Sequence, residues 1–469
     1  MAKHPKTEGV VNTVSQYRYT GEYGKNRSVY QWAGALGIVA LIVLGTHSPI
    51  FALGALGIAA MQIVFGEEDF SWKLIFILFS FANIFKLAPN STSLFTYLIL
   101  LFDVMLFIKH RTLPPIWIFF AIYTVAVPFI CMEWSCFNLL RWIKLLCNIL
   151  MMFYFFERET RDHEDEFFLF FVVGVILASL TYHLDSGFFR VSPYTFDQTV
   201  WYIGMSEEEN GMLRFAGLYS DPNYYSVNVI ISMCLMVILF HRDKIKLPAF
   251  ALLMAVLFYF VKETHSKSAL LMSSVPLLLF LYSNRLKQRQ MLQLVSIVAF
   301  SVTLIYLIAT GGGEIFGTVF GRLSAAKGDL NALTTGRFNI WVYTIEYFTE
   351  HPWRFLFGKG INSPLINNKG MHNVYIQMTW HVGLTGFIMI FEMLKQVLQT
   401  VHGRRERNLM NYSVLFCAAV MYFFLDLLFY FDPPYHLMIA FIVMNMDLDS
   451  SKQMAHLQTF GQQQAPSTS

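Results

Sequence analysis

The chain has 469 residues, of which 55% are hydrophobic and 17% aromatic, while only 14% carry a charge. Soluble domains average about 25% charged residues, so the composition excludes a soluble globular protein and indicates an integral membrane protein. The net charge of +3 is too small to suggest a nucleic-acid partner. The first thirty residues lack an apolar core, so no cleavable signal peptide is expected and the first spanning segment directs insertion.

A helix that crosses about 30 Å of hydrocarbon needs roughly 20 mostly apolar residues. Fourteen segments approach this length, and several are short or closely paired, so we predict about 12 to 14 membrane helices. Their starts lie near residues 30, 49, 72, 92, 114, 137, 167, 223, 247, 267, 291, 372, 409 and 433. The predicted fold is therefore all-α, a polytopic membrane helix bundle.

Lys and Arg residues orient the predicted bundle. The linkers KHR, ERETR, HRDKIK, NRLKQR and HGRRER all contain them, whereas THSP, LAPNST, MEWS and DPPY contain none. Cytoplasmic loops carry the excess of positive charge, so the first group is cytoplasmic and both termini are cytoplasmic. In a bacterium this corresponds to a multi-pass protein of the inner membrane.

Two extracytoplasmic segments are long, 185–222 and 310–371, the second lying between predicted helices near 291–309 and 372–394. Trp341, Ile345 and Phe348 recur at helical spacing in RFNIWVYTIEYF, which predicts an amphipathic helix on the outer membrane surface that ends before His351-Pro352. Residues 1–456 are predicted to form one membrane domain. The polar tail 457–469 is predicted to be disordered and cytoplasmic.

Basic residues gather at the predicted outer ends of the helices. Arg141 and Lys144 lie one turn apart, and the others are Arg214, Lys262, His265, Lys267, Arg337 and His372. Each has an ordinary explanation: Arg141 and Lys144 can extend to lipid headgroups, Lys262 can be a solvated surface charge, and His372 an interfacial histidine. Taken together they predict an anionic partner at the depth of the membrane lipids, such as a phosphate or pyrophosphate headgroup.

Three sequence blocks occur in order on the predicted outer side: RFAGLYSDPNYYS, THSKSALL, and a long stretch with FGRLS, TTGRFNIW, HPWRFLFGKG and MHNVYIQMTWHVGLTG. Together they resemble the O-antigen polymerase and O-antigen ligase superfamily over roughly residues 210–390. That resemblance implies transfer of a glycan from a polyprenyl (undecaprenyl) pyrophosphate to an acceptor glycolipid at the periplasmic face, without a metal or other cofactor. It also allows a chain-length regulator protein as a partner.

The resemblance implies roles for individual residues. Arg214, Lys267 and Arg337 match basic positions that would bind pyrophosphate, with Arg141 and Lys144 as further candidates, and His372 matches the essential histidine. Lys267 departs from the family arginine, which replaces a fork of donors with a point charge. Asn373 and Trp341 are candidates for binding the acceptor sugar, although Asn373 can equally orient the imidazole or cap a helix.

The chemistry of these residue types agrees with the implied roles. Displacing pyrophosphate from an anomeric carbon requires neutralisation of the leaving charge, which fixed arginines provide. The attacking sugar hydroxyl needs a proton acceptor that works near neutral pH, and histidine has that property. A direct displacement would invert the anomeric centre.

Other interpretations compete with this one. The pair Asp447 and Asp449 has the spacing of a metal-dependent transferase, and the run DHEDE at 162–166 is interpreted as a solvated cytoplasmic face. A transporter of lipid-linked sugars would use polar residues near the middle of the membrane, for which Asp103 and Asp426 are the candidates. Within the enzyme class, a polymerase and a ligase differ only in the acceptor, and the high segment count and many phenylalanines favour a polymerase by analogy.

Overall fold

The computed structural model describes residues 27–45, 48–85, 93–131, 134–157, 164–184, 205–207, 213–219, 222–282, 336–363, 371–400, 409–423 and 435–446. Most of these residues are helical. In chain order the elements are a first helix Arg27–Leu44, α2 (Pro49–Phe65), α3 (Glu68–Leu78), η1 (Phe79–Phe85), α4 (Leu94–His110), α5 (Pro115–Ile130), η2 (Trp134–Cys136), α6 (Leu139–Glu157), α7 (Glu164–Leu184), β1 (Met205–Glu207), β2 (Leu213–Phe215), α8 (Pro222–His241), α9 (Leu247–Glu263), α10 (Lys267–Met272), α11 (Ser274–Tyr282), α15 (Arg337–Glu350), α16 (Pro352–Phe357), α17 (Val374–Thr400), α18 (Leu409–Tyr422) and α19 (Tyr435–Asn445).

The predicted all-α membrane fold is confirmed. The predicted segment near residue 291 lies outside the described residues, and each of the others overlaps a helix. Among the described residues, four helices are long and apolar enough to cross a membrane, and several shorter apolar helices accompany them. The strands among the described residues form a two-stranded antiparallel hairpin, β1–β2. The count of 12 to 14 crossings and the domain boundaries stay predictions.

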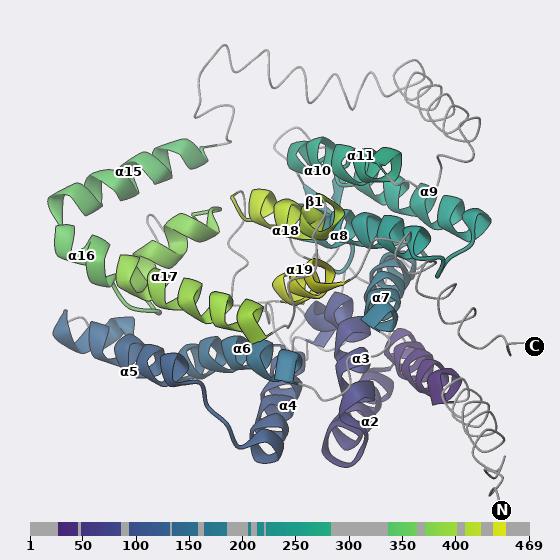
Figure 1. Ribbon diagram of the computed structural model, residues 1–469, viewed down its shortest axis with the longest axis horizontal. Coiled ribbons are helices and arrows are strands. Elements are labelled where there is room, and N and C mark those ends of the chain that lie inside the picture. The colour runs from purple at the N-terminus through teal and green to yellow at the C-terminus, as the bar shows by residue number, and fades with distance from the viewer. Residues whose placement is uncertain are drawn as a thin grey trace, which may run out of the picture.

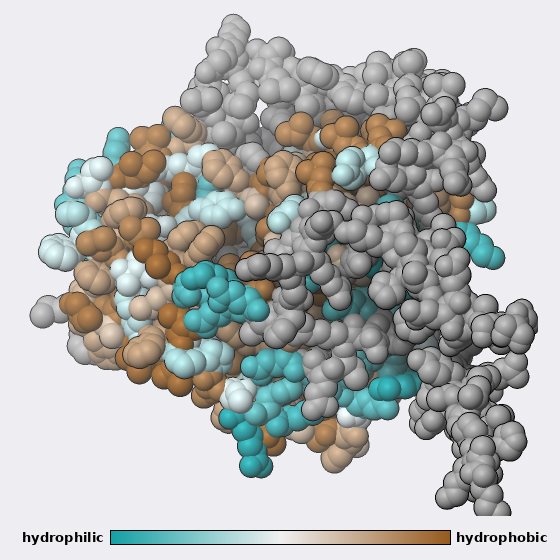
Figure 2. Space-filling model, in the orientation of Figure 1, coloured by the Kyte–Doolittle hydropathy of each residue, from teal (hydrophilic) through white to brown (hydrophobic). Residues whose placement is uncertain are grey.

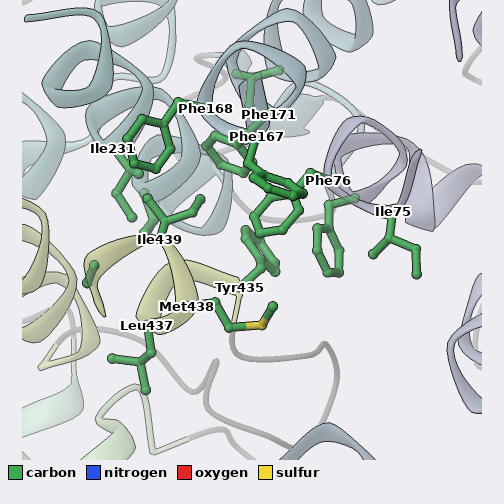
Figure 3. Packing of buried hydrophobic residues seen from close by; sticks show 14 of the residues in the cluster. Ile75, Phe76, Phe167, Phe168, Phe171, Ile231, Tyr435, Leu437, Met438 and Ile439 are labelled. Atoms are coloured by element: carbon green, nitrogen blue, oxygen red, sulfur yellow. The ribbon is translucent and has the colours of Figure 1, made fainter. Parts of the chain in front are cut away.

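The core lies where α3, α7, α8 and α19 meet. Figure 3 shows Phe76 of α3, Phe167 of α7 and Tyr435 of α19 packed together. Helix α8 is almost completely enclosed. Gly174 on α7 allows the closest approach, because a Cβ there would lie 2.4 Å from the Ile77 carbonyl oxygen of α3. Small residues at such crossings let helix backbones approach, which is how packing holds helices together in lipid.

Ion pairs join α3, α7 and α8 at one end of the bundle. The Lys73 side chain, almost fully buried, lies 2.8 Å from Asp69 and 2.5 Å from Glu166. Asp165 is also buried and lies 2.8 Å from Arg242. The interpretation of residues 162–166 as a solvated face is therefore wrong for Asp165 and Glu166. Their partners come from distant helices, so a local charge pattern could not reveal the pairing.

Helix ends that the sequence assigns to the cytoplasmic side contact one another. Arg27 pairs with Glu67 at 2.6 Å, joining the first helix to the α2–α3 turn, and Lys109 at the end of α4 pairs with Glu68. Glu166 and Arg242 belong to the same end of the molecule, as described above. These contacts join several of the ends predicted to be cytoplasmic, and the orientation itself stays a prediction.

Helices α15, α16 and α17 lie together in another part of the fold, where α17 packs on α5 (Figure 1). Figure 2 shows hydrophobic side chains over this part of the surface. Ile122, Ile388 and Phe391 are each more than half exposed there, as expected for side chains that face lipid. Within the described residues no disulfide joins Cys131 and Cys136.

Candidate functional site

The amphipathic helix predicted after Gly336 is α15, and its bounds, Arg337–Glu350, are those expected from the sequence. It packs on the start of α17, where the Trp341 Nε1 donates to the Met371 carbonyl oxygen at 2.8 Å. Tyr347 and Phe348 contact Trp380 on the same face. Ile345, which has the same helical spacing, is 58% exposed. The position of α15 on the outer membrane surface stays a prediction.

His372 lies directly before α17 in the left-handed backbone conformation, with φ of 47°. Its neighbours Met371 and Asn373 are buried, whereas the imidazole is half-buried. Trp341 lies one turn after Arg337 in α15, and its indole N–H bonds to the carbonyl of the peptide that joins Met371 to His372. The fold thus brings Arg337, Trp341 and His372 into one region, which we call the α15–α17 junction.

Asn373 caps α17. Its Oδ1 accepts a hydrogen bond from the Ile376 N–H at 3.1 Å, and its side chain is 1% exposed. The sequence left three roles open for Asn373: binding the sugar, orienting the imidazole or capping the helix. This hydrogen bond is that of a helix cap. A cap satisfies an amide that the first helical turn leaves unpaired. It also fixes the chain direction directly after His372.

Helix α17 is broken at Gly383, where φ is 66° and ψ is 178°. The break leaves carbonyls without helical partners, and a loop fills the gap: Lys359 N–H donates to Trp380 O and Gly360 N–H donates to His381 O, both at 2.9 Å. The Tyr123 hydroxyl of α5 donates to Val382 O at 2.7 Å. Non-helical backbone inside a membrane protein is stable when its polar groups are satisfied in this way.

Glycines permit this close contact between loop and helix. A Cβ on Gly358 would lie 2.6 Å from Gly383 N, and one on Gly383 would lie 2.4 Å from Leu356 O. Both residues have positive φ with ψ near 180°, a region that is essentially limited to glycine. This feature was not predicted from the sequence, although the glycine pairs in FGKG and VGLTG are a signal of close backbone approach.

His381 is a second histidine at the break, and sequence reasoning missed it. It is 4% exposed, and its Nδ1 lies 3.1 Å from both Ser363 Oγ and Gly360 O. Arg141 at the start of α6 lies within electrostatic range of this imidazole. Nearby, the Lys359 Nζ lies 4.7 Å from the centre of the Trp380 ring, a cation–π contact.

Arg141 and Lys144 begin α6, which packs on α5 and α17. Arg141 is exposed, and its backbone N–H donates a hydrogen bond to Asn138 Oδ1 at 3.0 Å. Lys144 is half-buried and also has contacts. Arg141 therefore lies near the broken part of α17, and the α15–α17 junction lies at the other end of the same helical piece.

Arg214 and Lys267 belong to a second region, built on α8, α9 and α10. Arg214 pairs with Ser206 in the β1–β2 hairpin, and Lys267 is the first residue of α10. Phe215 stacks on Phe260 of α9, which connects strand and helix. The side chains of Arg214 and Lys267 are not among the described parts of the chain, so their predicted roles stay predictions.

Helix α18 lies between the two regions (Figure 1). Tyr375 of α17 donates to the Ala419 carbonyl oxygen of α18 at 3.0 Å, and Trp341 contacts Phe423 just after α18. The described contacts thus join α15 to the peptide before His372, and Arg141 acts electrostatically on His381. The backbones of Arg214 and Lys267 come from elements on the other side of α18.

Polar residues inside the bundle bear on the competing interpretations. Asp103 on α4 is 2% exposed, and neither carboxyl oxygen has a hydrogen-bond partner among the described residues. Asn228 Oδ1 lies 2.8 Å from both Tyr435 Oη and His436 Nε2. This buried hydrogen-bond network was not predicted from the sequence. Asp426, Asp447 and Asp449 lie outside the described residues.

Residues 249–391 match the family model described as O-antigen ligase. The match runs from α9 into α17 and contains Lys267, Arg337, Trp341, His372 and Asn373, whereas Arg141, Lys144 and Arg214 precede it. It confirms the predicted resemblance to the O-antigen polymerase and ligase superfamily and supports a function of that general type. Comparison with curated proteins and with solved structures found no match.

Proposed function

Starting from this family match, we propose that the protein is a surface-polysaccharide polymerase. It transfers a glycan from an undecaprenyl pyrophosphate donor to an acceptor lipid-linked repeat unit at the periplasmic membrane face, without a metal and with inversion. The observation that supports the proposal is the α15–α17 junction, where Trp341, one turn after Arg337, bonds to the peptide that precedes His372 within the matched segment.

In the proposed reaction, His372 accepts the proton of the attacking sugar hydroxyl while the oxygen forms a bond to the anomeric carbon. The bond from that carbon to the pyrophosphate oxygen breaks, and the leaving group departs as an anion. Arg337 neutralises the developing charge with paired N–H donors. Asn373 acts on the reaction indirectly, because its cap on α17 holds the peptide that carries His372. Trp341, whose indole N–H is already bonded, offers a ring face to a sugar.

A ligase is the second candidate, because the matched family model is described by that activity. In that case the acceptor is a lipid A-core glycolipid, and the donor, the base and the arginine keep the same roles. The two activities differ in what enters the junction from the acceptor side. A chain-length regulator protein is a proposed partner of the polymerase only.

The test is reconstitution of the purified protein in nanodiscs with a lipid-linked repeat unit as the only glycan. We expect a ladder of products, undiminished by EDTA, and inversion of the new linkage. Transfer only after lipid A-core is added would identify a ligase instead. Strong inhibition by EDTA would contradict the metal-independent mechanism, and no transfer to either acceptor would favour a transporter of lipid-linked sugars.

An Arg337→Lys variant tests the role of the guanidinium. We expect kcat/KM for the pyrophosphate donor to fall by about 10- to 100-fold, because one ammonium cannot reproduce two parallel charged hydrogen bonds. The matched control is Arg27→Lys, whose arginine pairs with Glu67 at the far end of the bundle. Equal rates for Arg337→Lys and wild type would assign Arg337 a structural role.

A further inference from the structure

The aromatic rings of Tyr347 on α15 and Trp380 on α17 both face the ammonium group of Lys359. The Lys359 Nζ lies 4.8 Å from the centre of the Tyr347 ring and 4.7 Å from that of the Trp380 ring. The Lys359 N–H donates to the Trp380 carbonyl oxygen at 2.9 Å, so the backbone and the side chain of this lysine are both held against α17. We call the line along which α15 meets α17, from Asn373 to Trp380, the α15–α17 seam.

Lys359 differs from several other lysines in its partners. Within the described residues no Asp or Glu lies at ion-pair distance from its ammonium group, whereas a carboxylate pairs with each of Lys73, Lys109, Lys244, Lys262 and Lys395. Aromatic rings attract a cation without neutralising it, so a half-buried positive charge remains on the seam. An ionisable group kept inside a membrane protein is a candidate for a functional site, and the partner that this one needs is an anion.

Gln377 is a second polar group on the seam that needs a partner. It lies one turn after Asn373 and one turn before Trp380, so the three side chains share one face of α17. Its side chain is 5% exposed, and its Oε1 accepts no hydrogen bond from the described residues. A buried oxygen without a donor costs free energy, and in native proteins such a group is commonly completed by water or a ligand. The Gln377 oxygen therefore needs an O–H or N–H group from outside the described chain.

The order of these groups along α17 matches the order of groups in a sugar linked to a lipid diphosphate. In the predicted orientation α17 enters the membrane after His372, and the rise from Asn373 to Trp380 is about 10 Å. Gln377 and Lys359 thus follow His372 in the direction of the lipid. In the donor of the proposed reaction the diphosphate lies between the sugar and the isoprenoid chain. Sugar hydroxyls therefore precede phosphates in that same direction.

We propose that Lys359 and Gln377 bind the glycosyl diphosphate donor along the α15–α17 seam. The Lys359 ammonium binds an oxygen of the phosphate that carries the isoprenoid chain. The Gln377 Oε1 accepts a hydrogen bond from a hydroxyl or an acetamido N–H of the first sugar. Arg337 then binds the phosphate that is bonded to the anomeric carbon. The inference rests on the proposed function and adds two donor-binding residues to it.

Lys359→Met tests the charge, because methionine keeps an unbranched apolar stem against the two rings and lacks the ammonium. For the full-length protein in nanodiscs, we expect the Kd of undecaprenyl pyrophosphate to rise by about tenfold or more, since a charged hydrogen bond to phosphate is lost. Lys359→Arg keeps the charge and should stay within about threefold of wild type. Lys395→Met is the matched control, because Lys395 pairs with Glu392 farther along α17. Equal Kd values for Lys359→Met and wild type would overturn the role of Lys359.

Phosphatidylglycerol separates the donor from ordinary membrane lipid, which also carries a phosphate. We expect an excess of phosphatidylglycerol in the nanodisc to leave the Kd of undecaprenyl pyrophosphate unchanged in wild type. Competition at equal concentration would show that the seam binds any lipid phosphate, and the assignment to the donor would be wrong.

Gln377→Leu distinguishes a ligand-binding amide from one that is only buried. Leucine removes the oxygen that lacks a donor, so the variant should melt at or above the temperature of wild type. We expect KM for the lipid-linked repeat unit to rise about threefold to tenfold, as for one lost hydrogen bond, while the Kd of undecaprenyl pyrophosphate, which has no sugar, stays within about twofold. A thermal melt and an unchanged KM for the repeat unit would together assign Gln377 to packing and overturn its role in binding.

Failure of the donor site and failure of the proposed function give different results. If the protein makes polymer and Lys359→Met binds undecaprenyl pyrophosphate as wild type does, the function stands and the site is wrong. If the protein makes no polymer and Lys359→Met still weakens the binding of undecaprenyl pyrophosphate, the site stands and the polymerase is wrong.

Discussion

A His372→Asn variant is expected to form no polymer ladder in cells and to transfer glycan at least about 100-fold more slowly than wild type in nanodiscs. Asparagine tolerates the left-handed backbone found at His372, where φ is 47°, so the substitution removes the proton acceptor without straining the chain. An alanine would confuse the two effects. Initial rates measured with the lipid-linked repeat unit give the result.

His351→Asn is the matched control. His351 is exposed, stacks on Tyr347 and carries the same side chain in the same outer segment, yet it is outside the α15–α17 junction. We expect its rate to stay within about twofold of wild type, as for a surface substitution. A normal ladder from His372→Asn, with both variants present in the membrane at equal levels, would remove the base from the mechanism.

Gly358→Ala is expected to have the largest effect on stability. The added Cβ would lie 2.6 Å from both Gly383 N and His381 O, which are backbone atoms on the broken helix and cannot rotate away. Overpacking together with a glycine-only backbone conformation should lower the free energy of unfolding by at least about 3 kcal/mol. A thermal melt of the protein in nanodiscs, with the polymer ladder as a second readout, measures it.

Gly336→Ala separates the free-energy cost of steric overlap from the cost of the positive φ. Gly336 also has a positive φ, of 83°, but a Cβ added there would meet no described heavy atom within 4 Å. We expect a loss of only about 1 to 2 kcal/mol there, from backbone conformation alone. If Gly358→Ala melts at the same temperature as Gly336→Ala, the loop before Ser363 is not locked into α17 as described.

The sequence was sufficient for the features that depend on local composition. Apolar runs predicted the helices, and the spacing in RFNIWVYTIEYF together with Pro352 predicted the bounds of α15. The family motifs pointed to Arg337 and His372, which the fold brings to one junction. These signals are local, because a helix needs only its own apolar face and its end signals to be recognised.

Features made by distant partners could not be predicted. Asp165 looks solvated until Arg242, from the end of α8, pairs with it. The break at Gly383 lies within an apolar run, and hydropathy does not register a positive φ. Ser363 reaches His381 only because a loop enters that break. A pocket lined by Trp142 likewise exists because of how α4, α5 and α6 pack together.

The broken helix has a consequence for side reactions. Because protein groups satisfy the carbonyls of Trp380, His381 and Val382, this stretch of main chain can sit at the depth of the hydrocarbon without water. A donor held beside it would have its anomeric carbon shielded from bulk solvent, where a sugar acceptor delivered by its own lipid has the advantage. For the proposed glycosyl transfer, this would lower the rate of donor hydrolysis relative to the rate of transfer.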